Sequence, residues 1–187
     1  MVEKSTINSK GKKNKLIAYK PIEISLYNLK NTKSNISCCH KPKIADIKIL
    51  KNTYNIDTFL TILSDKEDPS SIKEECNNLN IQWLHLPLSG ANVSLFQNKE
   101  TKKIILDALY EVYFLLKYKE INLFMHCSAG IHRTGTMLYT ILRTFDEDKE
   151  SALDALKIIR QATRDGVGSQ RIEFAEKYLY LHSSKGL

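Results

Sequence analysis

The chain has 187 residues, of which 42% are hydrophobic and 26% charged, and its formal net charge is +7 at pH 7. This length fits one domain with a real hydrophobic core, and it excludes a TIM barrel or a two-domain dehydrogenase. Four cysteines in a chain of this size do not make a disulfide scaffold. The sequence shows no secretory signal or membrane span, so we expect a reducing, cytoplasmic or nuclear location.

The positive charge is concentrated near the amino terminus. Residues 1–51 contain 12 Lys and no Arg against three acidic residues, whereas the rest of the chain contains 16 basic and 18 acidic residues. A basic tail can attract nucleic acid or an anionic surface. The lysine-rich, polar composition of residues 1–15 more strongly predicts a disordered leader. We therefore expect this leader to precede one domain over residues 16–187.

Hydrophobic periodicity predicts the elements of that domain. Apolar, β-branched runs predict extended segments at 16–27, 57–63, 81–86 and 121–126. Apolar residues at helical spacing predict helices at 43–51, 69–78, 101–118, 134–145, 151–161 and 170–181. Strands and helices in this order indicate an α/β fold: a single domain with a central, mainly parallel, twisted sheet flanked by helices.

Residues 126–135 read HCSAGIHRTG and connect a predicted buried strand to an amphipathic helix. Such a loop is where α/β folds bind ligands, and its successive backbone N–H groups together with the helix dipole suit an anion such as phosphate. The residues expected to bind phosphate are Ser128, Ala129, Gly130, Ile131, His132 and Arg133.

Cys127 opens this loop and is the expected nucleophile. Backbone N–H donors, the positive helix end and Arg133 all favour its thiolate, which can attack phosphorus and form a phosphocysteine. The planar guanidinium of Arg133 can hold two phosphoryl oxygens at once. Gly130 permits the tight turn, and Thr134 can place a hydroxyl near the sulfur.

This string resembles the signature of the cysteine-dependent protein tyrosine phosphatases, in which His-Cys is followed by five residues, Arg, and Ser or Thr. The similarity is to the small dual-specificity type and covers residues 22–182. It implies catalysis by Cys127 and Arg133 without a metal or another cofactor, and an orienting role for His126. The residues that fix the match are His126, Cys127, Gly130, Arg133 and Thr134.

Two further stretches are similar to this family. Residues 57–87 resemble the strands that precede its acid loop, and residues 160–181 resemble the segment after its phosphate loop. The second similarity implies that Gln170 orients the hydrolytic water. Residues 36–39 and 46–63 are similar to the cyclin-dependent-kinase-associated phosphatases.

The sequence departs from the family pattern at the general acid. Gly90 stands where the resemblance places an Asp, and no Asp or Glu occurs between residues 75 and 100. The acid could come from Asp165, from Asp68 or from His132. The enzyme could instead act without an acid on substrates with good leaving groups, or bind phosphorylated ligands with little turnover. A positioned acid is worth roughly 10²–10⁴ in rate, so these alternatives differ measurably.

We therefore expect a phosphoric monoester hydrolase whose partner is a phosphorylated protein. Phosphotyrosine is the first substrate, with phosphoserine and phosphothreonine as further candidates. The alternatives are a phosphoprotein-binding pseudophosphatase, and a phosphatase of RNA 5′-phosphates or phosphoinositides. No metal site is expected, because Cys38, Cys39 and His40 have no second ligand pair at suitable spacing.

Overall fold

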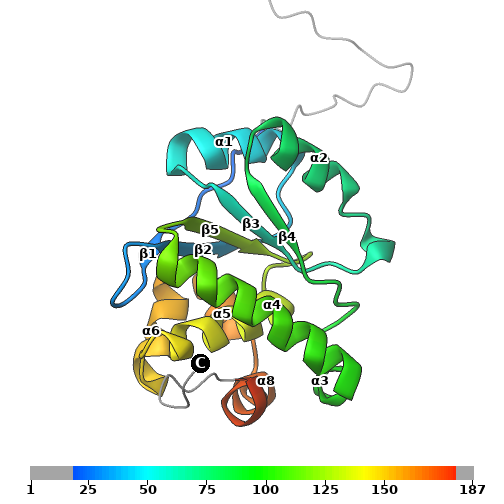
Figure 1. Ribbon diagram of the computed structural model, residues 1–187, viewed down its shortest axis with the longest axis vertical. Helices are drawn as coiled ribbons and strands as arrows, with labels where there is room; N and C mark the ends of the chain where they lie inside the picture. The colour runs from blue at the N-terminus through cyan, green and yellow to red at the C-terminus, as the bar shows by residue number, and fades with distance from the viewer. Residues whose placement is uncertain (1–18, 180–187) are drawn as a thin grey trace, which may run out of the picture.

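The computed structural model describes residues 19–179, which fold around a five-stranded sheet (Figure 1). The strands lie in the order β1-β2-β5-β3-β4, and each neighbouring pair is parallel except β1 and β2. Their bounds are β1 Tyr27–Asn28, β2 Asn35–Cys39, β3 Thr58–Thr61, β4 Gln82–His85 and β5 Asn122–His126. The predicted α/β class is confirmed, while the leader predicted at 1–15 lies outside the described residues.

Helices cover both faces of this sheet (Figure 1). One face carries α1 (Ile44–Tyr54) and α2 (Ser70–Asn78). The helices on the other side are α3 Val93–Gln97, α4 Lys99–Tyr118, α5 His132–Thr144, α6 Lys149–Ile159, α7 Gln161–Gly166 and α8 Ser169–Phe174. Within the described part of the chain, no helix has the length and hydropathy needed to cross a membrane.

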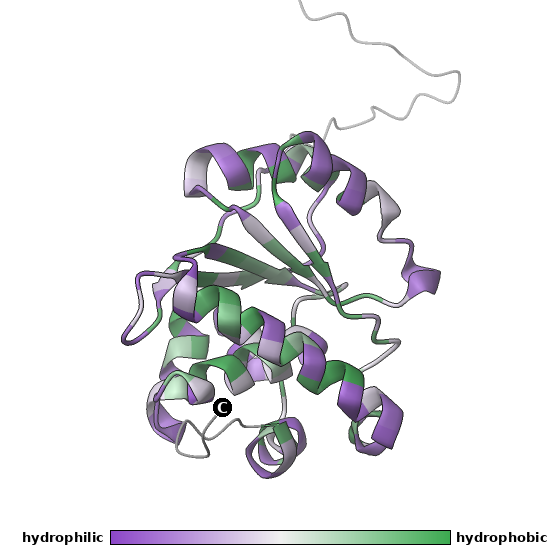
Figure 2. Ribbon diagram, in the orientation of Figure 1, coloured by the Kyte–Doolittle hydropathy of each residue, from purple (hydrophilic) through white to green (hydrophobic). Residues whose placement is uncertain are grey.

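The central strands β3 and β5 are buried on both faces, and Figure 2 shows hydrophobic residues along the middle of the sheet. Successive side chains of a strand point to opposite faces. Phe59 and Phe124 accordingly pack together under α1 and α2, with ring centroids 4.9 Å apart. Leu60, Leu123 and Met125 enter the larger core on the side of α4 and α5. This alternation gives the sheet two separate hydrophobic cores.

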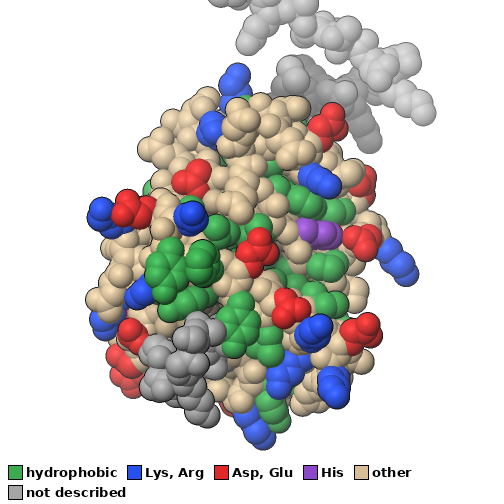
Figure 3. Space-filling view, viewed as in Figure 1, with side chains coloured by type: hydrophobic (Ala, Val, Ile, Leu, Met, Phe, Trp, Pro, Cys, Tyr) green, Lys and Arg blue, Asp and Glu red, His purple; other side chains and the backbone are tan. Residues whose placement is uncertain are grey.

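The amphipathic helix predicted at 101–118 is confirmed as α4. Its inner face is formed by the buried residues Ile105, Leu109, Val112 and Leu116. Its outer face exposes Tyr110, Phe114 and Tyr118, four residues apart. Figure 3, viewed from the side on which α4 lies, shows groups of apolar side chains at the surface.

The extended segment predicted at 16–27 forms a strand only at its end. Of residues 19–27, only Tyr27 pairs with β2. The carboxylate of Asp46, at the start of α1, accepts a hydrogen bond from the Ile22 N–H (3.1 Å) and another from the Tyr19 hydroxyl. The Asp46 side chain thus takes the place of a neighbouring strand as the hydrogen-bond partner of this segment. Strand β2 and helices α3 and α7 were not predicted.

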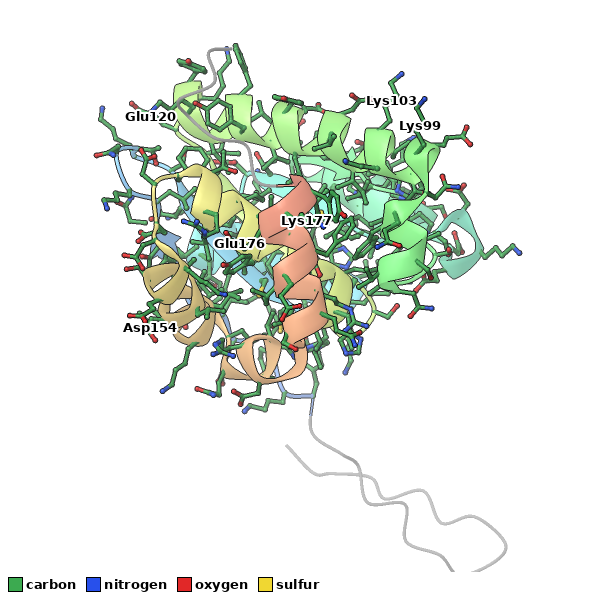
Figure 4. All side chains as sticks on the ribbon, turned by 90° about the horizontal axis from the view of Figure 1, so that it is seen from below. Lys99, Lys103, Glu120, Asp154, Glu176 and Lys177 are labelled. Carbon is green, nitrogen blue, oxygen red and sulfur yellow. The ribbon has the colours of Figure 1, made fainter. Side chains whose placement is uncertain are left out.

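The last predicted helix, 170–181, is formed in part. It consists of α8 and a π-helical turn, η2 (Ala175–Leu179), beyond which residues 180–181 lie outside the described part. Glu176 of η2, labelled in Figure 4, accepts hydrogen bonds from Arg143 Nε and from the Tyr139 hydroxyl, each at 2.5 Å. These bonds hold the end of the described chain against α5, the helix that follows the phosphate loop.

Ser34 connects α4 to the strand that leads into the site. Its fully buried hydroxyl donates to the Leu116 carbonyl (2.8 Å) and accepts from the Ile121 N–H (2.9 Å). Ser34 thus provides a hydrogen-bond partner both for the last turn of α4 and for the residue before β5. These two bonds fix where β5 begins.

We predict that Ser34→Ala lowers the free energy of unfolding by about 1–3 kcal/mol, because it leaves two buried backbone groups without partners. Urea denaturation of the protein measures this change in the free energy of unfolding. The matched control is Ser94→Ala, since Ser94 is exposed on α3. An equal effect of both substitutions would contradict a bridging role for Ser34.

Candidate active site

The phosphate loop, residues 127–133, begins where β5 ends in the middle of the sheet. The parallel register places Cys39 of β2 and Thr61 of β3 directly beside His126 of β5. The segments that follow these three strands therefore meet at one edge of the sheet, where α/β folds bind ligands. The loop then runs into α5, whose N-terminus directs its positive dipole end toward the site.

Gly130 sits directly on the end of β2. Its φ is +67°, and a Cβ atom on it would lie 2.0 Å from the Cys39 carbonyl oxygen. Any other residue would clash with backbone and adopt an unfavourable conformation. This explains physically why the loop requires glycine at this position.

Donors behind the loop hold three of its carbonyl groups. The Ser128 carbonyl accepts from the Lys41 N–H at 3.0 Å. Arg160 Nη1 donates to the carbonyls of Ala129 (3.0 Å) and Gly130 (2.9 Å), and the Thr163 hydroxyl donates to Gly130 at 2.7 Å. Because C=O and N–H point in opposite directions across a peptide plane, these bonds turn the following N–H groups into the loop.

The environment of Cys127 favours its thiolate. Burial opposes ionisation, but hydrogen bonds from the Thr134 hydroxyl and N–H and from the Ile131 N–H, with the charge of Arg133, lower the pKa of Cys127. The Thr134 hydroxyl is buried and has no nitrogen or oxygen partner among the described residues. A thiolate at Cys127 supplies the acceptor that this hydroxyl otherwise lacks.

His126 is fully buried beneath Cys127 and stays neutral, because burial lowers its pKa to about 3. Its Nε2 lies 3.0 Å from the Thr61 hydroxyl, which also accepts from Trp83 Nε1 at 2.9 Å. The indole N–H can only donate, so the Thr61 hydroxyl is the acceptor in its contact with Trp83. Thr61 and Trp83, which the sequence did not single out, thus orient this ring.

Arg133 is held by a carboxylate that sequence reasoning missed. Its Nη1 and Nη2 donate to the two carboxylate oxygens of Glu67, at 2.7 and 2.9 Å, and Nη1 also donates to the Leu88 carbonyl at 2.7 Å. Glu67 also accepts from the Ser128 hydroxyl (2.5 Å) and the Ser64 N–H (2.9 Å). The Arg133 guanidinium, followed by these partners, holds the pKa of Glu67 far below its usual range.

The sequence carried two signals for Glu67. It follows the carboxyl end of β3, and it stands three residues after Ser64 in a capping box, Ser-x-x-Glu, around η1 (Asp65–Glu67). Neither signal indicates that Arg133 is the partner of Glu67. Only the packing of β3 beside β5 brings the two residues together.

The three acid candidates from the sequence have other contacts. Asp165 accepts from Gln161 Nε2 at 2.7 and 2.8 Å, and Asp68 accepts from the Ser70 N–H at 3.2 Å. His132 lies at the first turn of α5; burial and the nearby charge of Arg171 lower its pKa, and the Gly166 backbone opposes them. Gln170 is exposed on α8.

No protein-family model matches the sequence, and no curated protein is detectably similar to it. Solved structures do resemble it. A kinase associated phosphatase with its catalytic cysteine replaced by serine is 16% identical over 83% of this chain and 97% of its own, with a TM-score of 0.58. The catalytic core of the PP-IP phosphatase SIW14 from S. cerevisiae is 18% identical over 86% and 87%, with a TM-score of 0.61.

A third solved structure, PTPMT1, is 18% identical over 82% of this chain and 96% of its own, with a TM-score of 0.54. These similarities show that the chain has the fold of the cysteine-dependent protein tyrosine phosphatases. The fold implied by the loop motif is confirmed.

We predict that Gly130→Ala lowers the free energy of unfolding by at least about 1–3 kcal/mol, because the clash with the Cys39 carbonyl adds to backbone strain, and that it displaces the loop N–H groups. Inhibition by orthovanadate, which measures oxyanion binding, is then expected to weaken at least about tenfold. Gly90→Ala is the matched control, since a Cβ on Gly90 meets no atom within 4 Å. Unchanged vanadate binding in Gly130→Ala would contradict the loop geometry.

We also predict that iodoacetamide modifies Cys127 before the other thiols at pH 7. Burial raises the pKa of Cys38 and of Cys76 to about 12, whereas that of Cys127 is lowered. The thiolate fraction rises as pH passes the pKa, so Cys127 reacts from a lower pH. Thr134→Val is expected to move its alkylation profile to higher pH, as measured by peptide mass spectrometry. Equal rates at Cys127 and Cys76 would exclude an activated thiolate.

Proposed function

We propose that this protein is a phosphoric monoester hydrolase that acts on phosphoproteins through a phosphocysteine intermediate. Phosphotyrosine is the first substrate in this proposal, and phosphoserine and phosphothreonine are further candidates. One observation carries it: Cys127, with a lowered pKa, lies in a loop whose N–H groups face inward, beside the buried guanidinium of Arg133. The phosphatase fold of the chain supports the same reaction class.

In the first step, the Cys127 thiolate attacks phosphorus. The S–P bond forms, the P–O bond to the leaving group breaks, and the electron pair of that bond stays on the leaving oxygen. Negative charge on the phosphoryl oxygens is stabilised by the inward N–H groups of the loop and by Arg133. The Thr134 hydroxyl, which serves the sulfur as a donor, stabilises it again when it leaves in the second step.

In the second step, water attacks the phosphocysteine and the S–P bond breaks. The Cys127 thiolate is regenerated, and both hydrogens of the water end on the product, as dihydrogen phosphate. Gln170 is the candidate to orient this water, on the strength of the family resemblance. The segment that leads to Gln170 adjoins the phosphate loop at Gly166, where an added Cβ would lie 2.5 Å from the Ile131 side chain.

We predict that the purified protein hydrolyses p-nitrophenyl phosphate in excess EDTA, and that Cys127→Ser reduces the rate to background. A serine hydroxyl is far less ionised than this thiol and is a poorer leaving group in the second step. Cys76→Ala, which removes a buried thiol on α2, is the control that retains activity. Turnover that survives Cys127→Ser would overturn the proposal. Phosphopeptide binding with no turnover in the native protein would instead identify a pseudophosphatase.

A further inference from the structure

One wall of the site, the connection between β4 and α3, carries no side chain that can donate a proton at neutral pH. Figure 1 shows this connection running from the tip of β4 to α3. The Leu88 carbonyl accepts from Arg133, and the Ala91 carbonyl accepts from Arg171 Nε at 2.7 Å. The connection is therefore bound to the phosphate loop and to α8. Its sequence, residues 86–92, reads LPLSGAN and contains no acid, histidine or cysteine.

Three carboxylates of the neighbouring segments, those of Glu67, Asp68 and Asp165, are engaged as hydrogen-bond acceptors. Glu67 receives bonds from Arg133 and from the Ser128 hydroxyl, which its protonated form could not accept at the same oxygens without loss. Asp68 receives the Ser70 N–H, and Asp165 receives both bonds from Gln161. Asp65, on η1, is exposed to solvent. Glu67, Asp68 and Asp165 would lose these hydrogen bonds on gaining a proton, which makes them poor proton donors.

His132 is the remaining candidate within the loop itself. Burial, followed by the positive charge of Arg171, lowers the pKa of His132, and the Gly166 backbone opposes this shift. Arg171 disfavours the imidazolium form, and the neutral ring is a weak acid. His132 is therefore poorly suited to protonate a leaving group near pH 7.

We infer that the protein selects substrates by the acidity of the leaving group: it dephosphorylates phenols and cleaves phosphoanhydrides, and it discriminates against phosphoserine and phosphothreonine. This inference rests on the proposed function, since it concerns the first step of that reaction. Without a proton donor, the leaving oxygen departs with the P–O electron pair as an anion. It takes its proton afterwards from water, which becomes hydroxide.

The chemistry of the leaving groups decides the order of substrates. A tyrosine phenol has a pKa of about 10, and a departing phosphate has one of about 6. An aliphatic alcohol is about as weak an acid as water, whose pKa is about 15.7. General acid catalysis contributes roughly 10²–10⁴ in rate, and its absence slows P–O cleavage most for the poorest leaving group.

Gly90 offers a direct way to test this inference. It lies between the two anchored residues, Leu88 and Ala91, and a Cβ on it meets no atom within 4 Å. Its φ is outside the left-handed range that disfavours side chains. The wall therefore has open space at the point where a side chain on residue 90 would begin.

The experiment compares the native protein with Gly90→Asp and with the isosteric, non-ionisable Gly90→Asn. The substrates are p-nitrophenyl phosphate, a series of phenyl phosphates of increasing phenol pKa, inorganic pyrophosphate, and one peptide carrying phosphotyrosine or phosphoserine. For the native protein, kcat/KM is expected to fall steeply with phenol pKa, and to be at least about 100-fold lower for phosphoserine than for phosphotyrosine.

Gly90→Asp is expected to flatten the dependence on phenol pKa and to raise phosphoserine turnover at least about tenfold, while p-nitrophenyl phosphate changes less than about twofold. Gly90→Asn is expected to behave like the native protein. The phenyl series separates leaving-group acidity from pocket shape, because its members differ little in size.

A shallow dependence on phenol pKa in the native protein, or phosphoserine turnover within about tenfold of phosphotyrosine, would overturn this inference. Asp65→Asn, Asp165→Asn, His132→Gln and His40→Gln would then identify the residue that donates the proton, as the variant whose phenyl series becomes steep. Failure to hydrolyse even p-nitrophenyl phosphate would overturn the proposed function itself. The two failures are therefore distinguishable.

Discussion

The contact between Gly130 and the end of β2 is the constraint on which the rest of the site depends. The turn at Gly130 lies so close to the Cys39 carbonyl that no side chain fits between them. Arg160 and Thr163 hold the carbonyls of the same turn from behind. Contacts with β2 and with the α6–α7 junction thus fix the orientation of the peptide groups in the loop. Because the carbonyls are held from behind, the N–H groups point into the loop.

A buried guanidinium needs a partner, and the ion pair with Glu67 supplies one. Arg133 is only 9% exposed, so its charge would be costly if it were unpaired. The bidentate contact sets the plane of the guanidinium before any phosphoryl group arrives. The positive potential that matters for chemistry is therefore local, and of the lysines in the first 51 residues Lys41 adds to it, with its Nζ 3.1 Å from the Glu67 carbonyl.

Much of the fold was readable because its elements have strong local patterns. Helix α4 and strands β3 and β5 were predicted from periodicity and continuous hydrophobicity. Strand β2 was missed because polar Asn35 and Ser37 interrupt its apolar pattern, although Ser37 is buried and donates to the Leu123 carbonyl. The segment before β1 was misread because Asp46, more than twenty residues away, takes the place of a neighbouring strand.

The sequence by itself determined the phosphate loop, since the residue types and spacing of HCSAGIHRTG are a local property of ten consecutive residues. This spacing alone places Cys127, Gly130 and Arg133 in one turn between a strand and a helix. Only the tertiary structure decided what surrounds that turn: Glu67 on Arg133, Thr61 and Trp83 on His126, and Arg160 on the loop carbonyls. Those pairings depend on which strands lie side by side, and sequence periodicity does not encode strand order.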